Sequence, residues 1–140
     1  MPDPVIDPAT LTAYRQTEYR VLGSMPMTLL VGVKCTELAV LHARYQTDCS
    51  AFITACNPLG ERQADAVNAR HEQALLQEIA RLGRVAIPGM GQHPTGTWPG
   101  EASYLVPGLG RAAAQELGRK FRQNAIIWAG SDAVPQLLLI

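Results

Sequence analysis

The sequence predicts an α+β or α/β fold in one globular domain spanning residues 1–140. We expect a single mixed β-sheet of about six strands with three to four packed helices. Short apolar or alternating segments typical of strands recur along the chain, and amphipathic segments of helical period separate them. Turns rich in glycine and proline stand between these segments. A chain of this length buries roughly two thirds of its unfolded surface without metals or disulfides.

The organising element of this prediction is a central strand over Ser50–Asn57. Most of its residues are small, aromatic or β-branched, and neither a proline nor a charged residue interrupts it. Pro58 follows directly, so we expect Asn57 to adopt the extended backbone of a pre-proline residue and to end the strand.

A helix, a hairpin and a second helix are predicted before this strand. The predicted segments are a helix over 8–16, strands over 17–22 and 28–33, and a helix over 36–45. Asp7 is a favourable N-cap and Pro8 a favourable first helical residue, and Tyr14 is expected to face inward. Residues 23–26 are typical of a turn, and Thr36 is a candidate N-cap for the second helix.

The longest predicted helix follows the central strand. The remaining predicted segments are a helix over 61–82, strands over 84–91 and 102–106, a helix over 110–123, and strands over 125–129 and 136–140. Gly83 is suited to end the long helix, because glycine accepts left-handed backbone. Asn68 lies on the apolar face of this helix, so we expect its amide to point at the core and to need partners there.

The charge balance argues against strongly electrostatic partners. The chain has 12 basic and 12 acidic residues, so no global field attracts nucleic acid or an anionic membrane. No apolar run approaches the length of a membrane span. Residues 1–7 carry acid where a signal peptide needs base, so export is not expected. We therefore expect a cytoplasmic protein with no nucleic-acid partner and no membrane partner.

Metal and cofactor sites are not expected. The three cysteines form no Cys-x-x-Cys pair and have no histidine at metal-ligand spacing, which fits free thiols in a reducing compartment. A zinc site built from His71, His93 and Glu101 is an alternative, although its spacings match no compact site.

A polar cluster near the end of the central strand is the sharpest functional hypothesis. The candidate ligand-binding residues are Thr54, Asn57, Asn68, Trp98, Glu101, Gln123 and Asn124. Ligands of open sheets bind beyond strand ends, where loops diverge and polar groups are available. Amides can read a ligand's hydrogen-bonding edge, Trp98 is a candidate stacking lid, and Glu101 or His93 is the candidate acid–base catalyst.

The alternative interpretation of this cluster is structural. Asparagine at caps and turns usually satisfies the local backbone. In that case Asn57 caps the long helix, Asn68 ties down the preceding loop, Glu101 pairs with an arginine and Asn124 ends its helix. Trp98 would then plug the end of the core rather than cover a ligand.

Two further motifs carry weaker functional hypotheses. The segment Gly108–Ala113 has the Gly-x-Gly-x-x-Ala form of a dinucleotide fingerprint, with Asp132 where a ribose-binding acid is expected. Few residues follow that acid, so glycines that allow tight packing at a helix start are the alternative. Cys56 is a candidate nucleophile with His71 or His93 as its base, and a buried inert thiol is its alternative.

The chain's apolar end suggests a different class of function. Residues 137–140 read Leu-Leu-Leu-Ile, and an exposed strand of this composition pairs readily with another chain. We expect either a buried strand or a homodimer interface there. An interaction module acting through this sheet edge or interface is therefore the alternative to ligand binding.

Several short motifs resemble a bacterial family of unknown function. They are Phe52–Pro58, Asn68, Glu101–Val106 and Phe121–Ala125, and together they are similar to domain of unknown function family 3293. The resemblance covers most of the chain. It implies a small, single-domain, cytoplasmic bacterial protein with no assigned activity, so it supplies no catalytic residue. It also implies that Cys56 and Gly60 hold no chemistry common to the family.

The polar cluster and the family resemblance together predict an uncharacterised domain that binds a small polar ligand near the end of the central strand. A nucleotide-like molecule is one candidate for that ligand. Whether the protein is an enzyme stays open at this point.

Overall fold

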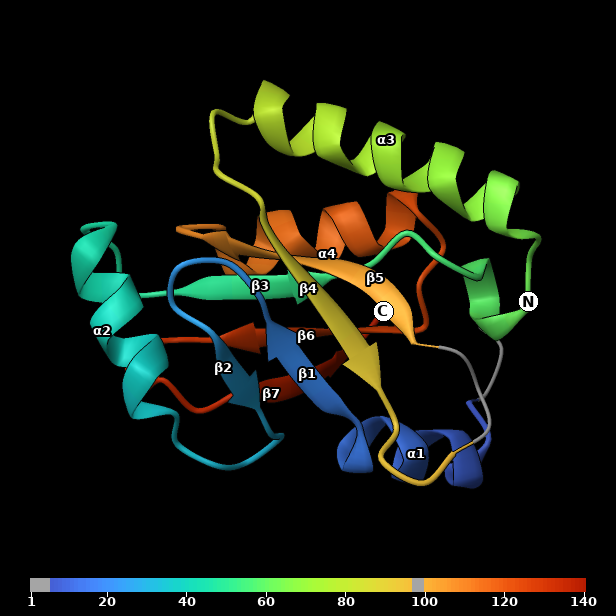
Figure 1. Ribbon diagram of the computed structural model, residues 1–140, viewed down its shortest axis with the longest axis horizontal. Coiled ribbons are helices and arrows are strands. Elements are labelled where there is room, and N and C mark those ends of the chain that lie inside the picture. The colour runs from blue at the N-terminus through green and yellow to red at the C-terminus, as the bar shows by residue number, and fades with distance from the viewer. Residues whose placement is uncertain (1–5, 97–99) are drawn as a thin grey trace.

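The computed structural model describes residues 6–96 and 100–140. Within them, one seven-stranded sheet curls into a half-barrel that carries four α-helices (Figure 1). The strands are β1 (Glu18–Val21), β2 (Met27–Leu29), β3 (Ser50–Ile53), β4 (Ile87–Gln92), β5 (Glu101–Pro107), β6 (Ala125–Ala129) and β7 (Gln136–Leu139). The helices are α1 (Pro8–Gln16), α2 (Thr36–Arg44), α3 (Asp65–Arg81) and α4 (Arg111–Lys120). The α+β prediction is confirmed, with a strand count slightly above the expected one.

Every strand pair in this sheet is antiparallel, so the expectation of a mixed sheet is wrong. The strand order is β2-β1-β4-β5-β3-β6-β7. The connection from β5 through α4 to β6 does join two parallel strands, but β3 lies between them. In the same way β5 separates β3 from β4. Strands joined through a helix were expected to be parallel neighbours. The helical connections through α3 and α4 instead each pass over one antiparallel strand.

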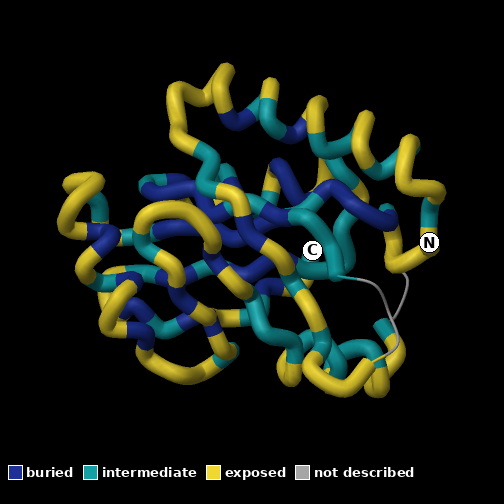
Figure 2. The backbone as a smooth tube through the Cα atoms, viewed as in Figure 1, coloured by how far each residue is buried: buried dark blue, intermediate teal, exposed yellow. Residues whose placement is uncertain are grey.

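The two faces of the sheet bury separate apolar clusters. Helices α3 and α4 cover the outer face, where Ile53, Leu75 and Leu117 belong to one cluster. Helix α2 covers one end of the inner face, where Leu38 and Phe52 belong to the other. In Figure 2 the buried residues lie along the strands, whereas the outer sides of α1 and α3 are exposed. Every residue of β3 is buried, and its side chains point alternately to the two faces. This strand therefore contributes side chains to both apolar clusters.

The half-barrel is closed at the α2 end by backbone hydrogen bonds between loops. Gly32 N–H donates to the Pro135 carbonyl at 2.8 Å, and Cys35 N–H donates to the Ala133 carbonyl at 2.9 Å. These bonds join the segment after β2 to the segment before β7. Helix α1 lies near the other end, and none of its residues is buried.

Several boundaries differ from the sequence prediction. Strand β3 ends at Ile53, not at Asn57, and α3 begins at Asp65 instead of residue 61. Asn57 has φ 48° and ψ 63°, so it adopts left-handed backbone even though it precedes Pro58. Its side-chain hydrogen bonds stabilise this conformation, which asparagine accepts more readily than most residues. The expectation of an extended pre-proline residue is therefore wrong.

The helix caps give a mixed result. Asp7 is the N-cap of α1, where its Oδ1 accepts a hydrogen bond from the Ala9 N–H at 2.9 Å, and Pro8 is the first helical residue. The prediction for α1 is thereby confirmed. Thr36 is the first residue of α2 instead of its N-cap, a position that Cys35 occupies.

Among the described residues, no helix combines the length and the apolar character needed to cross a membrane.

Candidate functional site

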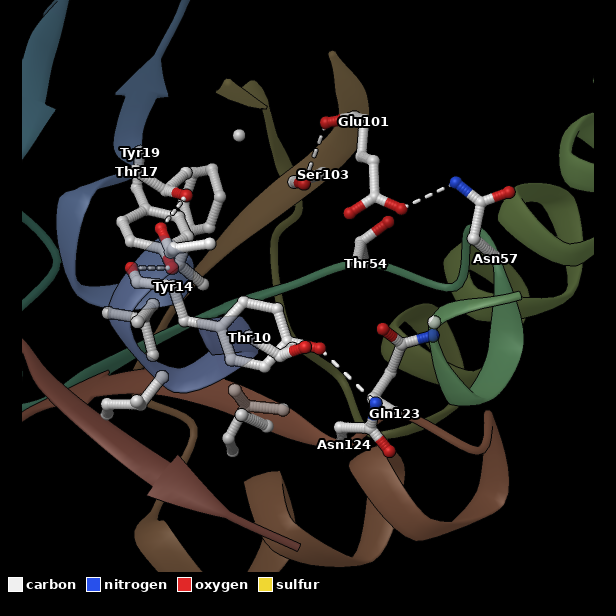
Figure 3. Close-up of a pocket in the computed structure, with 18 of the residues that line it drawn as sticks. Thr10, Tyr14, Thr17, Tyr19, Thr54, Asn57, Glu101, Ser103, Gln123 and Asn124 are labelled. Atoms are coloured by element: carbon white, nitrogen blue, oxygen red, sulfur yellow. Dashed lines mark hydrogen bonds between the residues drawn. The ribbon is translucent and has the colours of Figure 1, made fainter. Parts of the chain in front are cut away.

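A cavity of about 430 Å³ lies between α1 and the inner face of the sheet, and we call it the α1 cavity. Its wall is formed by α1, six strands, and the loops before α3 and β6 (Figure 3). The lining residues are Ala9, Thr10, Ala13, Tyr14, Thr17, Tyr19, Phe52, Thr54, Asn57, Gly60, Gly91, His93, Glu101, Ser103, Gln123, Asn124, Ala125, Ile126, Ile127 and Leu137. The site therefore lies on the sheet's inner face and not only beyond the strand ends.

An aromatic pair forms part of the cavity wall. The rings of Tyr19 and Phe52 meet edge to face, with centroids 5.6 Å apart and an interplanar angle of 71°. Two glycines of β4 leave room for these rings, since a Cβ at Gly89 would lie 2.7 Å from Phe52 and one at Gly91 would lie 3.6 Å from Tyr19. The glycine pattern of β4 thus allows large rings to lie close against the sheet.

A hydrogen-bonded network surrounds the buried Asn57. Its backbone N–H donates to Asn68 Oδ1 at 2.9 Å, and its Oδ1 accepts from Asn68 Nδ2 at 3.0 Å and from the Gln63 N–H at 2.8 Å. Its Nδ2 donates to Glu101 Oε2 at 2.7 Å. All polar atoms of the Asn57 side chain therefore have partners, and the network orients the Glu101 carboxylate.

Gln123 presents an acceptor to the α1 cavity. Its Nε2 donates to the backbone carbonyls of Cys56 at 3.1 Å and Phe121 at 3.2 Å. Carbonyl groups only accept, so the amide nitrogen faces them and Oε1 turns the other way. Figure 3 shows this oxygen pointing into the cavity. The orientation of the amide is thereby fixed by the surrounding backbone.

Tyr14 of α1 meets the sheet side of the cavity through Asn124. Asn124 Nδ2 donates to the Tyr14 hydroxyl at 3.3 Å, an interaction between residues 110 positions apart. The hydroxyl of Tyr19 donates to the Tyr14 backbone carbonyl at 2.6 Å. Burial raises the pKa of the Tyr19 phenol, so this group stays protonated and keeps donating. These two bonds hold α1 over the cavity.

His93 is held at the rim of the cavity. Its Nδ1 accepts from the Thr95 N–H at 3.2 Å, and its Nε2 lies 3.1 Å from Gln16 Oε1. Two hydroxyl groups of the lining donate hydrogen bonds to backbone carbonyls. Thr54 donates to Ala102 at 2.7 Å, and Ser103 donates to Glu101 at 3.0 Å.

The structure brings most of the candidate residues together. Those that line the α1 cavity are Thr54, Asn57, His93, Glu101, Gln123 and Asn124. Asn68 is outside the lining, and its amide hydrogen-bonds Asn57 on both sides, as the structural interpretation of this residue expects. Trp98 lies outside the described residues.

Sequence reasoning missed the contribution of α1. Thr10, Ala13 and Tyr14 of α1 and its C-cap Thr17 all line the cavity, although only the inward position of Tyr14 was expected. The period of an amphipathic helix shows which face is inward, but it does not show which strand that face meets. Tyr19 also lines the cavity, although it was expected only to lie in the strand predicted over 17–22.

Cys56 lies outside the cavity lining and is buried. Its Sγ donates to the Ala102 carbonyl at 3.6 Å, and burial raises the pKa of the thiol. A raised pKa reduces the thiolate fraction, which is the nucleophilic form. His93 is engaged by Gln16 and Thr95, and His71 Nδ1 is buried without a hydrogen-bond partner. The environment of Cys56 is therefore that of an inert thiol.

The remaining motifs take structural positions. Gly108 has φ 80°, and its N–H donates to the Cys49 carbonyl at 2.8 Å in the turn after β5. This positive φ strains residues with a Cβ, which accounts for the glycine in the turn. Among the described residues, no group of three or more His, Cys, Asp or Glu side chains is placed to hold a metal ion.

Comparison with known proteins adds a family but no activity. No curated protein and no solved structure matches the chain at a significant level. Residues 53–126 match the family described as "Protein of unknown function (DUF3293)", and these residues include α3, β4, β5, α4 and the whole network around Asn57. The chain therefore belongs to the DUF3293 family.

Proposed function

We propose that the protein binds a small polar ligand in the α1 cavity. The observation that carries this proposal is the convergence of Glu101, Gln123 and Tyr14 on one cavity, which is otherwise lined mainly by apolar and aromatic groups. A volume of about 430 Å³ lies in the range of small-molecule sites. Such sites combine apolar walls with a few polar groups whose orientation is fixed.

The network around Asn57 supports binding by organising the polar end of the cavity. Asn68 is a closed, hydrogen-bonded amide and does not contact the cavity, so its contribution to binding acts through Asn57. Asn57 in turn orients Glu101. A preoriented carboxylate does not lose conformational entropy when a ligand arrives.

Filling the cavity from α1 is expected to abolish ligand binding. Ala13 lines the cavity, so Ala13→Leu would place three further carbon atoms inside it while keeping a good helix former. A ligand that binds only the native state raises its melting temperature by mass action. In a thermal-shift screen of metabolites, we expect compounds that stabilise the wild type to have no effect on Ala13→Leu.

The matched control for this experiment is Ala74→Leu on α3. Ala74 is exposed and lies outside the cavity lining, so the same chemical change there should leave the ligand response intact. A compound whose stabilising effect is equal in both variants binds elsewhere, and it would contradict the proposal. The absence of any stabilising compound in a broad screen would also count against it.

A homodimer through β7 is the second candidate, and the position of this strand favours it. β7 is the last strand of the sheet order, and Leu139 is 50% exposed. Ile140 N–H donates to the Asn124 carbonyl, and alternation along the ladder then turns the backbone groups of Leu137 and Leu139 towards the open edge. Antiparallel pairing of this edge with a second copy satisfies two-fold symmetry.

Leu139→Lys is expected to disrupt this dimer without disrupting the fold. A lysine on an edge strand opposes strand pairing, and the half-exposed position tolerates the charge. Leu82→Lys is the control, because Leu82 is 48% exposed and lies at the C-cap of α3, where a cation is favourable. Sedimentation should show a dimer for the wild type and Leu82→Lys and a monomer for Leu139→Lys. A monomeric wild type at high concentration refutes this candidate.

A further inference from the structure

Gln123 supplies a hydrogen-bond acceptor to the α1 cavity. Its amide nitrogen is committed to the carbonyls of Cys56 and Phe121, so its Oε1 turns the other way and points into the cavity (Figure 3). No described residue donates a hydrogen bond to this oxygen. The two carbonyls prevent the amide from flipping, because a flip would turn an acceptor towards two acceptors. A ligand therefore meets a fixed acceptor at this position.

The Tyr14 hydroxyl supplies a donor to the same cavity. It accepts a hydrogen bond from Asn124 Nδ2 at 3.3 Å, and a hydroxyl that accepts still has its own proton to donate. No described residue accepts this proton. The backbone carbonyl of Tyr14 is held by the Tyr19 hydroxyl at 2.6 Å, which fixes this turn of α1 against the sheet. Asn124 follows Gln123 in the chain, so the donor and the acceptor lie in the same part of the cavity (Figure 3).

The charged groups around the cavity favour an uncharged ligand. The described lining contains no lysine and no arginine, the side chains that usually recognise carboxylates and phosphates. An anion would lose its hydration there without a compensating cation, so a ligand with phosphate groups is a poor match. Glu101 is engaged by Asn57 Nδ2 at 2.7 Å and by a further interaction, so we assign it no contact with the ligand.

Aromatic and aliphatic side chains form much of the remaining wall. Tyr19 and Phe52 meet edge to face, and Ile127 and Leu137 also line the cavity. Walls of this kind gain free energy by burying the apolar body of a ligand. The cavity thus combines a donor and a fixed acceptor with space for an apolar ring.

We infer that the ligand of the α1 cavity is an uncharged amide with an apolar ring, whose N–H group donates to Gln123 Oε1 and whose carbonyl accepts from the Tyr14 hydroxyl. This inference rests on the proposed function and names the ligand class for the same site. An amide carries a donor and an acceptor on neighbouring atoms without a net charge. Each of its two polar groups then has a partner when the ligand leaves water.

Four benzene derivatives of nearly the same shape test the inference: benzamide, acetophenone, benzoate and benzamidinium. Each is titrated at millimolar concentrations into ¹⁵N-labelled protein, and dissociation constants are taken from amide chemical shifts. Acetophenone has a methyl group in place of the amide nitrogen and leaves Gln123 Oε1 without a donor, so we expect it to bind about fivefold more weakly than benzamide. Benzamidinium presents no acceptor to Tyr14 and should also bind about fivefold more weakly, and benzoate at least about tenfold more weakly.

Two variants separate the two contacts. Tyr14→Phe removes the donor, so benzamide and acetophenone should both bind about fivefold more weakly while the ratio of their affinities stays the same. Gln123→Met removes the acceptor, so this ratio should fall to about one. Tyr45→Phe is the matched control for Tyr14→Phe, because Tyr45 is exposed and outside the lining, and it should leave all four constants unchanged. If Gln123→Met does not fold, the wild-type ratio and Tyr14→Phe decide the inference.

The outcomes separate this inference from the proposed function. If the four probes bind the wild type equally and all lose binding in Ala13→Leu, the cavity binds ligands but the amide inference is wrong. Tighter binding of benzoate or benzamidinium than of benzamide overturns the inference, and so does a benzamide affinity that Tyr14→Phe or Ala13→Leu leaves unchanged. No measurable binding of benzamide overturns it as well, whereas a compound of another class found by the thermal-shift screen would still support the cavity.

Discussion

Gly89→Ala is expected to lower the free energy of unfolding by about 3 kcal/mol, the largest effect that we expect from adding one methyl group. A Cβ at this position would lie 2.5 Å from the Arg20 carbonyl oxygen and 2.7 Å from the Phe52 ring. Arg20 is paired in β1 and Phe52 is buried in the inner core, so neither atom moves at small cost. The added methyl group can be accommodated only if β1 and β4 separate or the Phe52 ring leaves its position.

Gly91→Ala is the matched control for this prediction. Gly91 lies on the same strand and face, but a Cβ there would meet Tyr19 at 3.6 Å and Thr17 at 3.8 Å, which are ordinary contacts. We expect its stability to remain within about 1 kcal/mol of the wild type. Urea denaturation should show a much lower midpoint for Gly89→Ala at an unchanged slope. Equal midpoints for the two variants would refute the close approach of Phe52 to β4.

Asn57→Asp is expected to destabilise the protein by roughly 2–4 kcal/mol at neutral pH. The substitution replaces the amide that donates to Glu101 at 2.7 Å with a second carboxylate. The new side chain still accepts from Asn68 and from the Gln63 N–H, and aspartate tolerates left-handed backbone almost as asparagine does. The expected loss therefore reports the contact with Glu101 and not the backbone conformation. Chemical denaturation at pH 7 measures it.

The double variant Asn57→Asp/Glu101→Gln supplies the control. An amide at position 101 can donate to a carboxylate at position 57, which reverses the direction of the original hydrogen bond. We expect the double variant to recover most of the stability that Asn57→Asp loses, so the coupling energy in a double-mutant cycle should be large. Additive losses from the two substitutions would show that the two side chains do not interact as the structure places them.

The pH dependence of Asn57→Asp gives a second measurement of the same contact. Repulsion between the two carboxylates raises the pKa of one of them in the folded variant above its unfolded value. The folded state then binds a proton more tightly than the unfolded state, so the variant gains stability relative to the wild type as the pH falls through the raised pKa. The deficit should be complete above that pKa and should shrink at acidic pH. A deficit that is constant with pH would contradict the prediction.

The sequence predicts individual elements better than their arrangement. The N-cap Asp7 and the apolar faces of the helices follow from local chemistry, and the structure has α1 where they predict it. The antiparallel sheet does not follow from them, because β3 lies between β5 and β6 and so changes both pairings. Strand insertion depends on contacts between distant residues, which local periodicity does not describe.

The same limit applies to the candidate site. Asn57, Glu101, Gln123 and Asn124 were identifiable because polar side chains stand at the ends of apolar segments. Tyr14 was not, since its contact with Asn124 joins residues 110 positions apart. The left-handed backbone of Asn57 was also hidden, because the rule for residues before proline favours extended backbone, and the side-chain network overrides that rule.

Strand β3 is synthesised before both of its partners. β5 ends at Pro107 and β6 at Ala129, so a growing chain carries an unpaired β3 until these residues have been added. Hairpins such as β1–β2 and β6–β7 join strands that are near in sequence and close quickly, whereas non-local pairing is slow. The strand whose residues are all buried in the finished protein is therefore the apolar segment that stays unpaired longest, and it is the segment that a chaperone would protect during synthesis.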